Sequence, residues 1–207
     1  MMAASPTSRL IKEDPMLKDL AFKSRSYRRF DNAAAIPMKT LEELAELARV
    51  CPSAANRQPL RFILSASAED NEAIFACLKW AAYLKDWDGP APHERPSAYS
   101  VLVNTDRAWE MARFDMGIMA QTMLLGAVEK GFGGCMIGAL DREKLRLHLG
   151  LDPEMEVGLV LALGKPVEEV RIVDVPEDGS IRYWRDEAGV HYVPKRRLEE
   201  LVLDKRP

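Results

Sequence analysis

Residues 108–138 read AWEMARFDMGIMAQTMLLGAVEKGFGGCMIG, and the rest of the chain must be built around them. Apolar residues cover most of the circumference of the helix predicted from Ala108 to Lys130, so this helix is expected inside the protein. Alanine in place of its Gly126 is expected to cost little chemistry. The glycines of Gly131–Gly138 either cap the helix or let the backbone approach a flat ligand. They lack the GxGxxG spacing of a dinucleotide-binding turn.

Helices and short strands alternate through the remaining sequence. Thr40-Leu41-Glu42-Glu43 has the capping-box pattern of a helix start, and the apolar run 156–163 predicts a central strand. After Pro166 the sequence becomes polar, so this tail is expected to lie across the main domain or a partner subunit. We predict one domain over residues 1–207 of the α+β class, with a small mixed sheet flanked by helices. The other predicted helices are 15–22, 72–79, 142–149 and one from 198, and the other predicted strands are 61–65, 99–104 and 181–184.

Composition narrows the classes of function. The chain has 207 residues, 47% of them hydrophobic, and a formal net charge of -3 with its basic residues dispersed among acidic ones. This charge pattern argues against nucleic-acid and membrane partners and favours small molecules. The three cysteines form no CxxC pair, and no signal peptide or membrane span is evident, so we predict a cytoplasmic protein. No metal site is expected, because His93, His148 and His191 lack ligand spacing and suit exposed or structural roles.

Four separated segments carry groups suited to an anionic, planar ligand. Arg25-Ser26-Tyr27-Arg28-Arg29 offers guanidinium forks and a hydroxyl to a phosphate or a ring edge, although a solvated basic turn is the alternative. In the second segment, 52–59, Asn56 and Gln58 could face a heterocycle, or the segment could be an ordinary loop. The glycine segment is the third. The fourth is Lys195-Arg196-Arg197, for which a solvated flank of a helix is the alternative.

These segments resemble nitroreductase-family flavoproteins. The resemblance spans roughly residues 20–200 and rests on three motifs in the family's order: Arg25-Ser26-x-Arg28-x-Phe30, Pro52-Ser53-x-x-Asn56-x-Gln58-Pro59 and Gly131-x-Gly133-x-Cys135-x-Ile137-Gly138. The run Glu94–Tyr99, the ending Val193-Pro194-Lys195-Arg196 and Asp115 in the predicted helix are similar to one bacterial branch. For Asp115, a buried, hydrogen-bonded structural carboxylate is expected rather than a catalytic base.

The resemblance implies an intertwined homodimer with two FMN sites at its interface. About 20 N-terminal residues would form a helix or arm, and residues 170–207 would extend onto the partner subunit. Arg25, Ser26 and Arg28 would meet the phosphate, the ribityl chain and the pyrimidine edge, while Lys195 and Arg196 would complete the phosphate clamp. Ser24 stands where many relatives have a further arginine. The ring would be faced by Asn56 at its polar edge, by the backbone of Ile137 and Gly138 near N5, and by Pro52, Ser53 and Ala54 of the partner chain.

The function implied is that of an FMN-dependent oxidoreductase. A hydride would pass from NADH or NADPH through flavin N5 to a small, flat acceptor such as a nitroaromatic, quinone or enone by ping-pong kinetics. No side chain is expected to be catalytic; the backbone of Gly138 would assist at N5. The substrate face would be lined by Trp80, Tyr83 and Trp87, for which core packing is the alternative. Two rivals are a flavin-binding or dimeric interaction protein without turnover, and a same-fold enzyme that performs reductive dehalogenation or flavin fragmentation.

Overall fold

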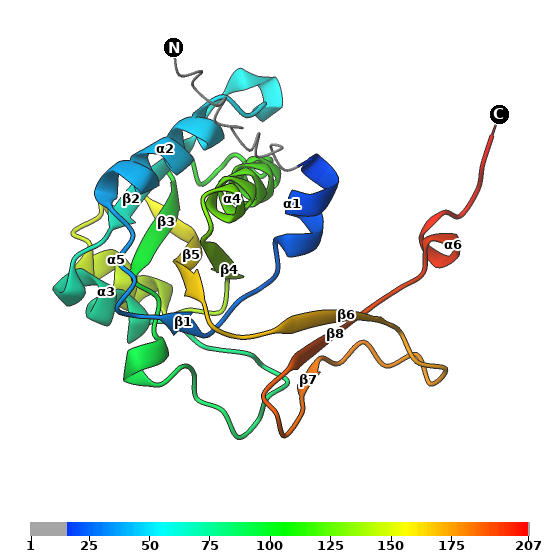
Figure 1. The fold of residues 1–207 in the computed structure, drawn as a ribbon. Coiled ribbons are helices and arrows are strands. Elements are labelled where there is room, and N and C mark those ends of the chain that lie inside the picture. Colours follow the sequence, from blue (N-terminus) through cyan, green and yellow to red (C-terminus); the bar gives the residue numbers. More distant parts are fainter. Residues whose placement is uncertain (1–15, 207) are drawn as a thin grey trace, which may run out of the picture.

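A five-stranded antiparallel sheet forms the centre of the protein, and the computed structural model describes residues 16–206 (Figure 1). Its strands are β1 (Phe30–Asp31), β2 (Leu60–Ser65), β3 (Ala98–Asn104), β4 (Gly133–Ile137) and β5 (Glu156–Pro166). Strand β5 pairs with β1, β3 and β4, and β2 pairs with the other side of β3. The prediction of a central strand at 156–163 is confirmed.

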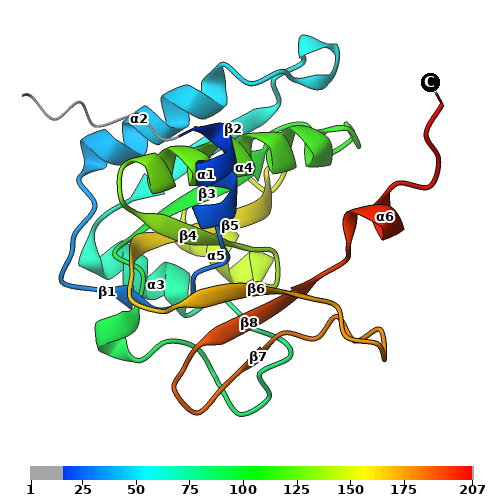
Figure 2. The same cartoon turned by 45° about the vertical axis from the view of Figure 1, so that its right-hand side comes forward.

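Helices cover both faces of this sheet (Figure 2). On one face lie α2 (Met38–Arg49) and α4 (Ala112–Glu129), with α1 (Leu17–Lys23) beside α4. On the other face lie α3 (Ala68–Phe75) and α5 (Arg142–His148). Two apolar cores result, one between the sheet and α2 and α4, the other between the sheet and α3 and α5. The predicted α+β class is confirmed.

Several predicted helix starts are wrong, and α4 begins at Ala112, four residues after the predicted Ala108. Helix α2 begins at Met38 after Pro37, so Thr40 lies inside the first turn and makes no capping hydrogen bond. Helix α3 begins at Ala68, four residues before the predicted start, because the Ser67 side chain accepts a hydrogen bond from the Asp70 amide and caps the helix there. The Ser67 cap thus starts α3 before the predicted helical stretch begins.

The glycine segment after α4 is largely a strand rather than a loop. Gly131 has a φ of 80°, which ends the helix as a glycine cap would, and β4 starts two residues later. A Cβ on Gly134 would lie 2.6 Å from the Ala162 carbonyl oxygen of β5. Close pairing of β4 with β5 therefore accounts for this glycine.

Helix α4 is buried on only part of its circumference, so the expectation that it lies wholly inside is wrong for the single chain. Phe114 and Ile118 are 54% and 43% exposed, because α2 and the sheet cover only one side of the helix. Gly126 does lie inside: an added Cβ would come within 2.5 Å of Leu47 Cδ1, so alanine there would push Leu47 aside. The predicted small effect of Gly126→Ala on the chemistry stays a prediction.

The tail forms a second, three-stranded sheet that projects from the body of the protein (Figures 1 and 2). Strand β8 (His191–Lys195) pairs in parallel with β6 (Val170–Asp174) and antiparallel with β7 (Trp184–Arg185), and α6 (Leu198–Leu201) follows. The strand predicted at 181–184 shares only Trp184 with β7, and β6 and β8 were not predicted. Two single-turn 3-10 helices, Ala54–Asn56 and Pro92–Glu94, complete the elements. No helix in the described part of the chain is long and apolar enough to cross a membrane.

Candidate functional site

A cleft between the body and the tail sheet contains two adjoining cavities. The first, the basic cavity, has a volume of about 340 Å³ and is lined by Arg25, Ser26, Arg28 and Lys195, with Ser24, Gln121, Val170, Tyr183, His191 and Val193. The second, the glycine cavity, has a volume of about 150 Å³ and is lined by Trp80 and by the end of β4 through Ile137, Gly138 and Ala139. Arg28 and Tyr183 line both cavities. They therefore mark the boundary between the two.

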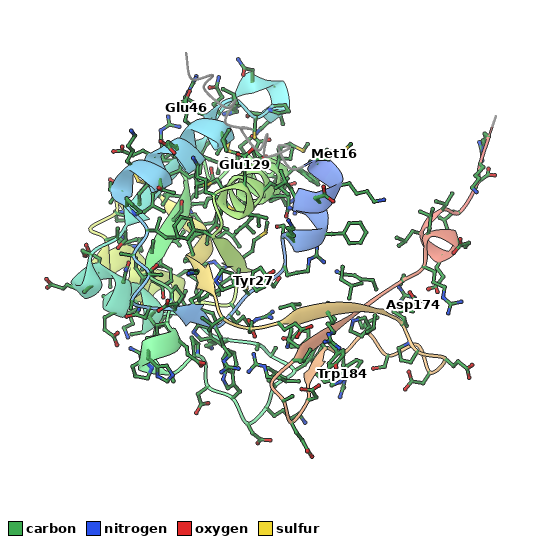
Figure 3. All side chains as sticks on the ribbon, viewed as in Figure 1. Met16, Tyr27, Glu46, Glu129, Asp174 and Trp184 are labelled. Atoms are coloured by element: carbon green, nitrogen blue, oxygen red, sulfur yellow. The ribbon has the colours of Figure 1, made fainter. Side chains whose placement is uncertain are left out.

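The basic turn is attached to the sheet through its backbone. The Tyr27 amide donates a hydrogen bond to the Gly134 carbonyl at 3.0 Å, so the turn follows the edge of β4. The amides of Arg28 and Arg29 both donate to Oε1 of Glu168, a residue just beyond β5. In Figure 3, Tyr27 marks the body side of the cleft and Trp184, next to Tyr183, marks the tail side. The turn is thus held by strand pairing and by a buried carboxylate.

The Arg28 guanidinium lies against the tail. It sits 5.1 Å from the centre of the Tyr183 ring, and its Nη1 is 3.3 Å from His191 Nε2. Tyr183 in turn packs on Tyr83 and His191 at ring-centre separations of 4.9 and 5.2 Å. This packing fixes a positive charge at the junction of the two cavities.

His191 is buried and neutral. Burial, and then the charges of Arg28 and Arg185, lower the pKa of His191 to about 4. Arg28 can only donate, so Nε2 of the neutral ring accepts and the ring hydrogen resides on Nδ1. That buried Nδ1 has no hydrogen-bond partner among the described residues, and neither does the buried Nε of Arg25. The basic cavity therefore has donors that nothing in the described chain satisfies.

Gly138 is a glycine of the cleft that the conformation and packing of the chain do not explain. Its φ is not in the left-handed region, and an added Cβ would have only one atom within 4 Å, Leu159 Cδ1 at 3.9 Å. Neither backbone geometry nor packing within the chain requires glycine here. The residue is exposed and lies where the glycine cavity opens.

The three aromatic residues predicted for a substrate face are divided between two cavities. Trp80 lines the glycine cavity and packs on Phe75 and Trp87. Tyr83 and Trp87 line an open cavity of about 450 Å³ next to it, together with Tyr183, Trp184 and Arg185. Tyr183 joins all three cavities, so the aromatic residues surround one continuous region.

The loop that carries Pro52, Ser53, Ala54 and Asn56 lines neither cavity of its own chain. The buried carboxylate of Asp115 accepts from Ser53 Oγ at 2.5 Å and from the Ala54 amide at 3.0 Å, which confirms its predicted hydrogen-bonded role. Ala55, Asn56 and Gln58 have φ values of 52°, 51° and 50°. Three left-handed residues that are not glycine make a costly loop of the kind that gathers at binding sites. A role for this loop in the partner's site stays a prediction.

The remaining predicted residues are placed as follows. Arg25, Ser26, Arg28 and Lys195 come together in the basic cavity, and Ser24 lies there too. Arg196 instead is exposed and pairs with Glu200 at 3.3 Å. Within residues 16–206 no cluster of histidine, cysteine, aspartate and glutamate is suited to a metal.

Sequence reasoning missed Tyr183, His191, Gln121 and Glu168. His191 and Tyr183 come from the polar tail, where no motif marks them. Glu168 follows the central strand as one acidic residue among several. Only the packing of the tail against the basic turn reveals these residues.

The chain belongs to the nitroreductase family: the family model matches residues 22–165. The Bacillus subtilis protein "Putative NAD(P)H nitroreductase YdgI" is 27% identical over 179 residues, which cover 70% of this chain and 86% of that protein. The iodotyrosine deiodinase of Thermotoga neapolitana is 24% identical over 193 residues, with 86% of this chain and 97% of the relative covered.

Solved structures share the fold. A nitroreductase family protein from Streptococcus pneumoniae TIGR4 superposes with a TM-score of 0.65 at 17% identity and covers 92% of this chain and 100% of its own. An FMN-dependent nitroreductase from Clostridium difficile R20291 gives a TM-score of 0.61 at 20% identity, covering 72% of this chain and 87% of its own. Membership of this family fits an oxidoreductase activity.

Proposed function

We propose that this protein is an FMN-dependent oxidoreductase that passes a hydride from NADH or NADPH to a small, flat acceptor. The observation that carries the proposal is the basic cavity, directly beside the open backbone at Gly138. It is lined by Arg25, Arg28 and Lys195, and two of its lining residues carry buried donors, Arg25 Nε and His191 Nδ1, without partners among the described residues. An anionic group would satisfy the donors, and a flat ring would fit against backbone that bears no side chain.

The residues present fit FMN. Arg25, Ser26 and Lys195 would hold its phosphate and ribityl chain, Arg28 its pyrimidine edge, and the β4 end at Ile137 and Gly138 its central ring. When bound, FMN would supply the hydride chemistry. The protein's residues contribute placement and charge: Arg28 provides a fixed positive charge at the junction of the cavities, and Tyr183 shields it from water on the tail side.

The aromatic residues support a flat acceptor. Trp80, Tyr83, Trp87 and Tyr183 surround the region next to the glycine cavity. Rings stack well on such surfaces. Nitroaromatics, quinones and enones are acceptors of this shape, and alternate use of one open face by nucleotide and acceptor gives ping-pong kinetics.

Reductive dehalogenation is the second candidate, because the similarity to a deiodinase extends over 86% of this chain. In that reaction two electrons and a proton would replace the halogen of an aromatic ring by hydrogen and release halide. The same cleft would serve both reactions, so the two candidate functions differ in the acceptor that the protein reduces.

The proposal is tested on purified protein by its visible spectrum and by anaerobic reduction. We expect a yellow flavin band, FMN on release, and bleaching by NADH or NADPH that a nitroaromatic or a quinone reverses. Release of iodide from an iodinated phenol, without nitroaromatic turnover, would favour the second candidate. Protein that neither contains nor binds FMN would overturn both.

We further propose that the protein is a homodimer in which the tail embraces the partner. Phe114 and Ile118 share an exposed face of α4, and Leu198, Leu201 and Leu203 are 67%, 63% and 97% exposed at the end of the tail. So much exposed apolar surface on separate elements is typical of an interface. The strained loop at 52–58 would then reach the cleft of the partner.

We expect sedimentation velocity at low micromolar concentration to show a dimer that resists dilution. A Phe114→Glu variant should shift it toward monomer and reduce its flavin content, since two sites would lose their partner residues. A compact, folded monomer of the parent protein at that concentration would contradict the embracing arrangement.

A further inference from the structure

Glu168 is a buried carboxylate at a junction of three segments. Its side chain is fully buried. Oε1 accepts hydrogen bonds from the amides of Arg28 and Arg29, and Oε2 accepts from Arg185 Nη2 at 3.0 Å. The basic turn, the exit of β5 and strand β7 of the tail therefore meet at one side chain.

This geometry favours a positioning role. A carboxylate that accepts two consecutive amides fixes the peptide orientation there, and the direction of the Arg28 side chain follows from that orientation. Arg29 is drawn away from the cleft to pair with Glu94, while Arg28 is directed to the junction of the basic and glycine cavities. The carboxylate thus lies behind the arginine that we assign to FMN.

Glu168 also fixes the tail side of the cleft. Arg185, its partner through Oε2, lies over the Trp87 ring at 4.7 Å and follows Trp184 and Tyr183 in the chain. Burial lowers the pKa of Arg185, and the Glu168 carboxylate opposes that effect and balances the buried guanidinium charge. One side chain therefore sets the separation between the Arg28 turn and the Tyr183 segment.

We propose that Glu168 is a positioning residue for flavin binding, which acts by holding the Arg28 backbone and the Arg185 side chain in place. The inference rests on the proposed FMN site. The direction of the change in FMN affinity distinguishes positioning from a purely electrostatic effect. A negative charge near a cluster of arginines weakens anion binding, so removal of that charge by itself should tighten FMN binding. Loss of positioning should weaken it.

The experiment measures FMN dissociation constants by fluorescence titration of flavin-free protein. We expect Glu168→Gln to weaken FMN binding about tenfold or more, because its amide group offers a donor where donors already point. Glu168→Asp, which keeps the charge but is one methylene shorter, should fall between Gln and the parent. Glu169→Gln is the matched control: this neighbour is exposed, and among residues 16–206 its side chain pairs with Arg171 alone, so binding should stay near the parental value.

A double-mutant cycle with Arg28→Ala completes the test. If Glu168 acts mainly through Arg28, then Glu168→Gln should cost much less in the Arg28→Ala background than in the parent. Circular dichroism checks that each protein is folded at the titration temperature. If Glu168→Gln is not folded, the FMN titration of Glu168→Asp takes its place as the test. Unchanged or tighter binding by Glu168→Gln, parental binding by a Glu168→Asp that replaces it, or an equal loss in both backgrounds, overturns the inference. Absence of FMN binding by the parent itself overturns the proposed function, which is a separate result.

Discussion

An Arg28→Ala variant is expected to bind FMN about ten- to a hundredfold more weakly than the parent while keeping its fold, since a charge-assisted hydrogen bond to an anionic ligand contributes about 1.5–3 kcal/mol. Arg28 lines both cavities, so its loss affects the phosphate side and the ring side together. The measurement is an FMN titration combined with stopped-flow reduction by NADH or NADPH.

The fold should survive because backbone hydrogen bonds hold this turn to the body, and the guanidinium adds only one bond to the turn itself, from Nη1 to the Ser26 carbonyl at 3.2 Å. The Arg28 amide still donates to Glu168, and the Tyr27 amide still donates to Gly134. Arg107→Ala provides the control, with the same change in net charge at an exposed site whose guanidinium donates to the Pro153 carbonyl. Parental FMN occupancy and reduction rate in Arg28→Ala would remove this residue from the site.

Gly138→Val is expected to impair flavin reduction far more than it lowers the melting temperature. The chain leaves room for the new side chain, since the added Cβ would be 3.9 Å from its one near neighbour, Leu159 Cδ1. A branched side chain there would instead occupy the space of a flat ring or turn the backbone N–H away from it. We expect a loss of at least about tenfold in the rate of reduction by NADH or NADPH, which corresponds to about 1.4 kcal/mol of transition-state stabilisation.

Gly126→Ala is unsuitable as a control, because its added methyl group would collide with Leu47. Gly117→Ala is the better match: the residue is exposed, and a Cβ there would have no atom within 4 Å. Sedimentation verifies that this variant on α4 remains a dimer. If Gly138→Val is reduced at the parental rate with full FMN occupancy, the end of β4 does not face N5.

The sequence alone determined the class of fold and the family. Apolar stretches located β5 and the body of α4, and three ordered motifs predicted the nitroreductase family that the family model confirms. Such signals are local, because consecutive residues carry the apolar stretch or the motif. They also located Arg25, Ser26, Arg28 and Gly138, which the structure brings to one cleft.

The tertiary structure alone decided what surrounds those residues. Glu168, Tyr183 and His191 lie at least 139 residues from the basic turn, and their roles follow from the folding of a polar tail without a recognisable motif. The reason for each glycine is also visible only in the tertiary structure. Neighbouring segments pack closely against Gly126 and Gly134, whereas Gly138 has open space before it. The physical reason is that contacts, burial and free space are properties of segments brought together by folding, which no pattern within one segment contains.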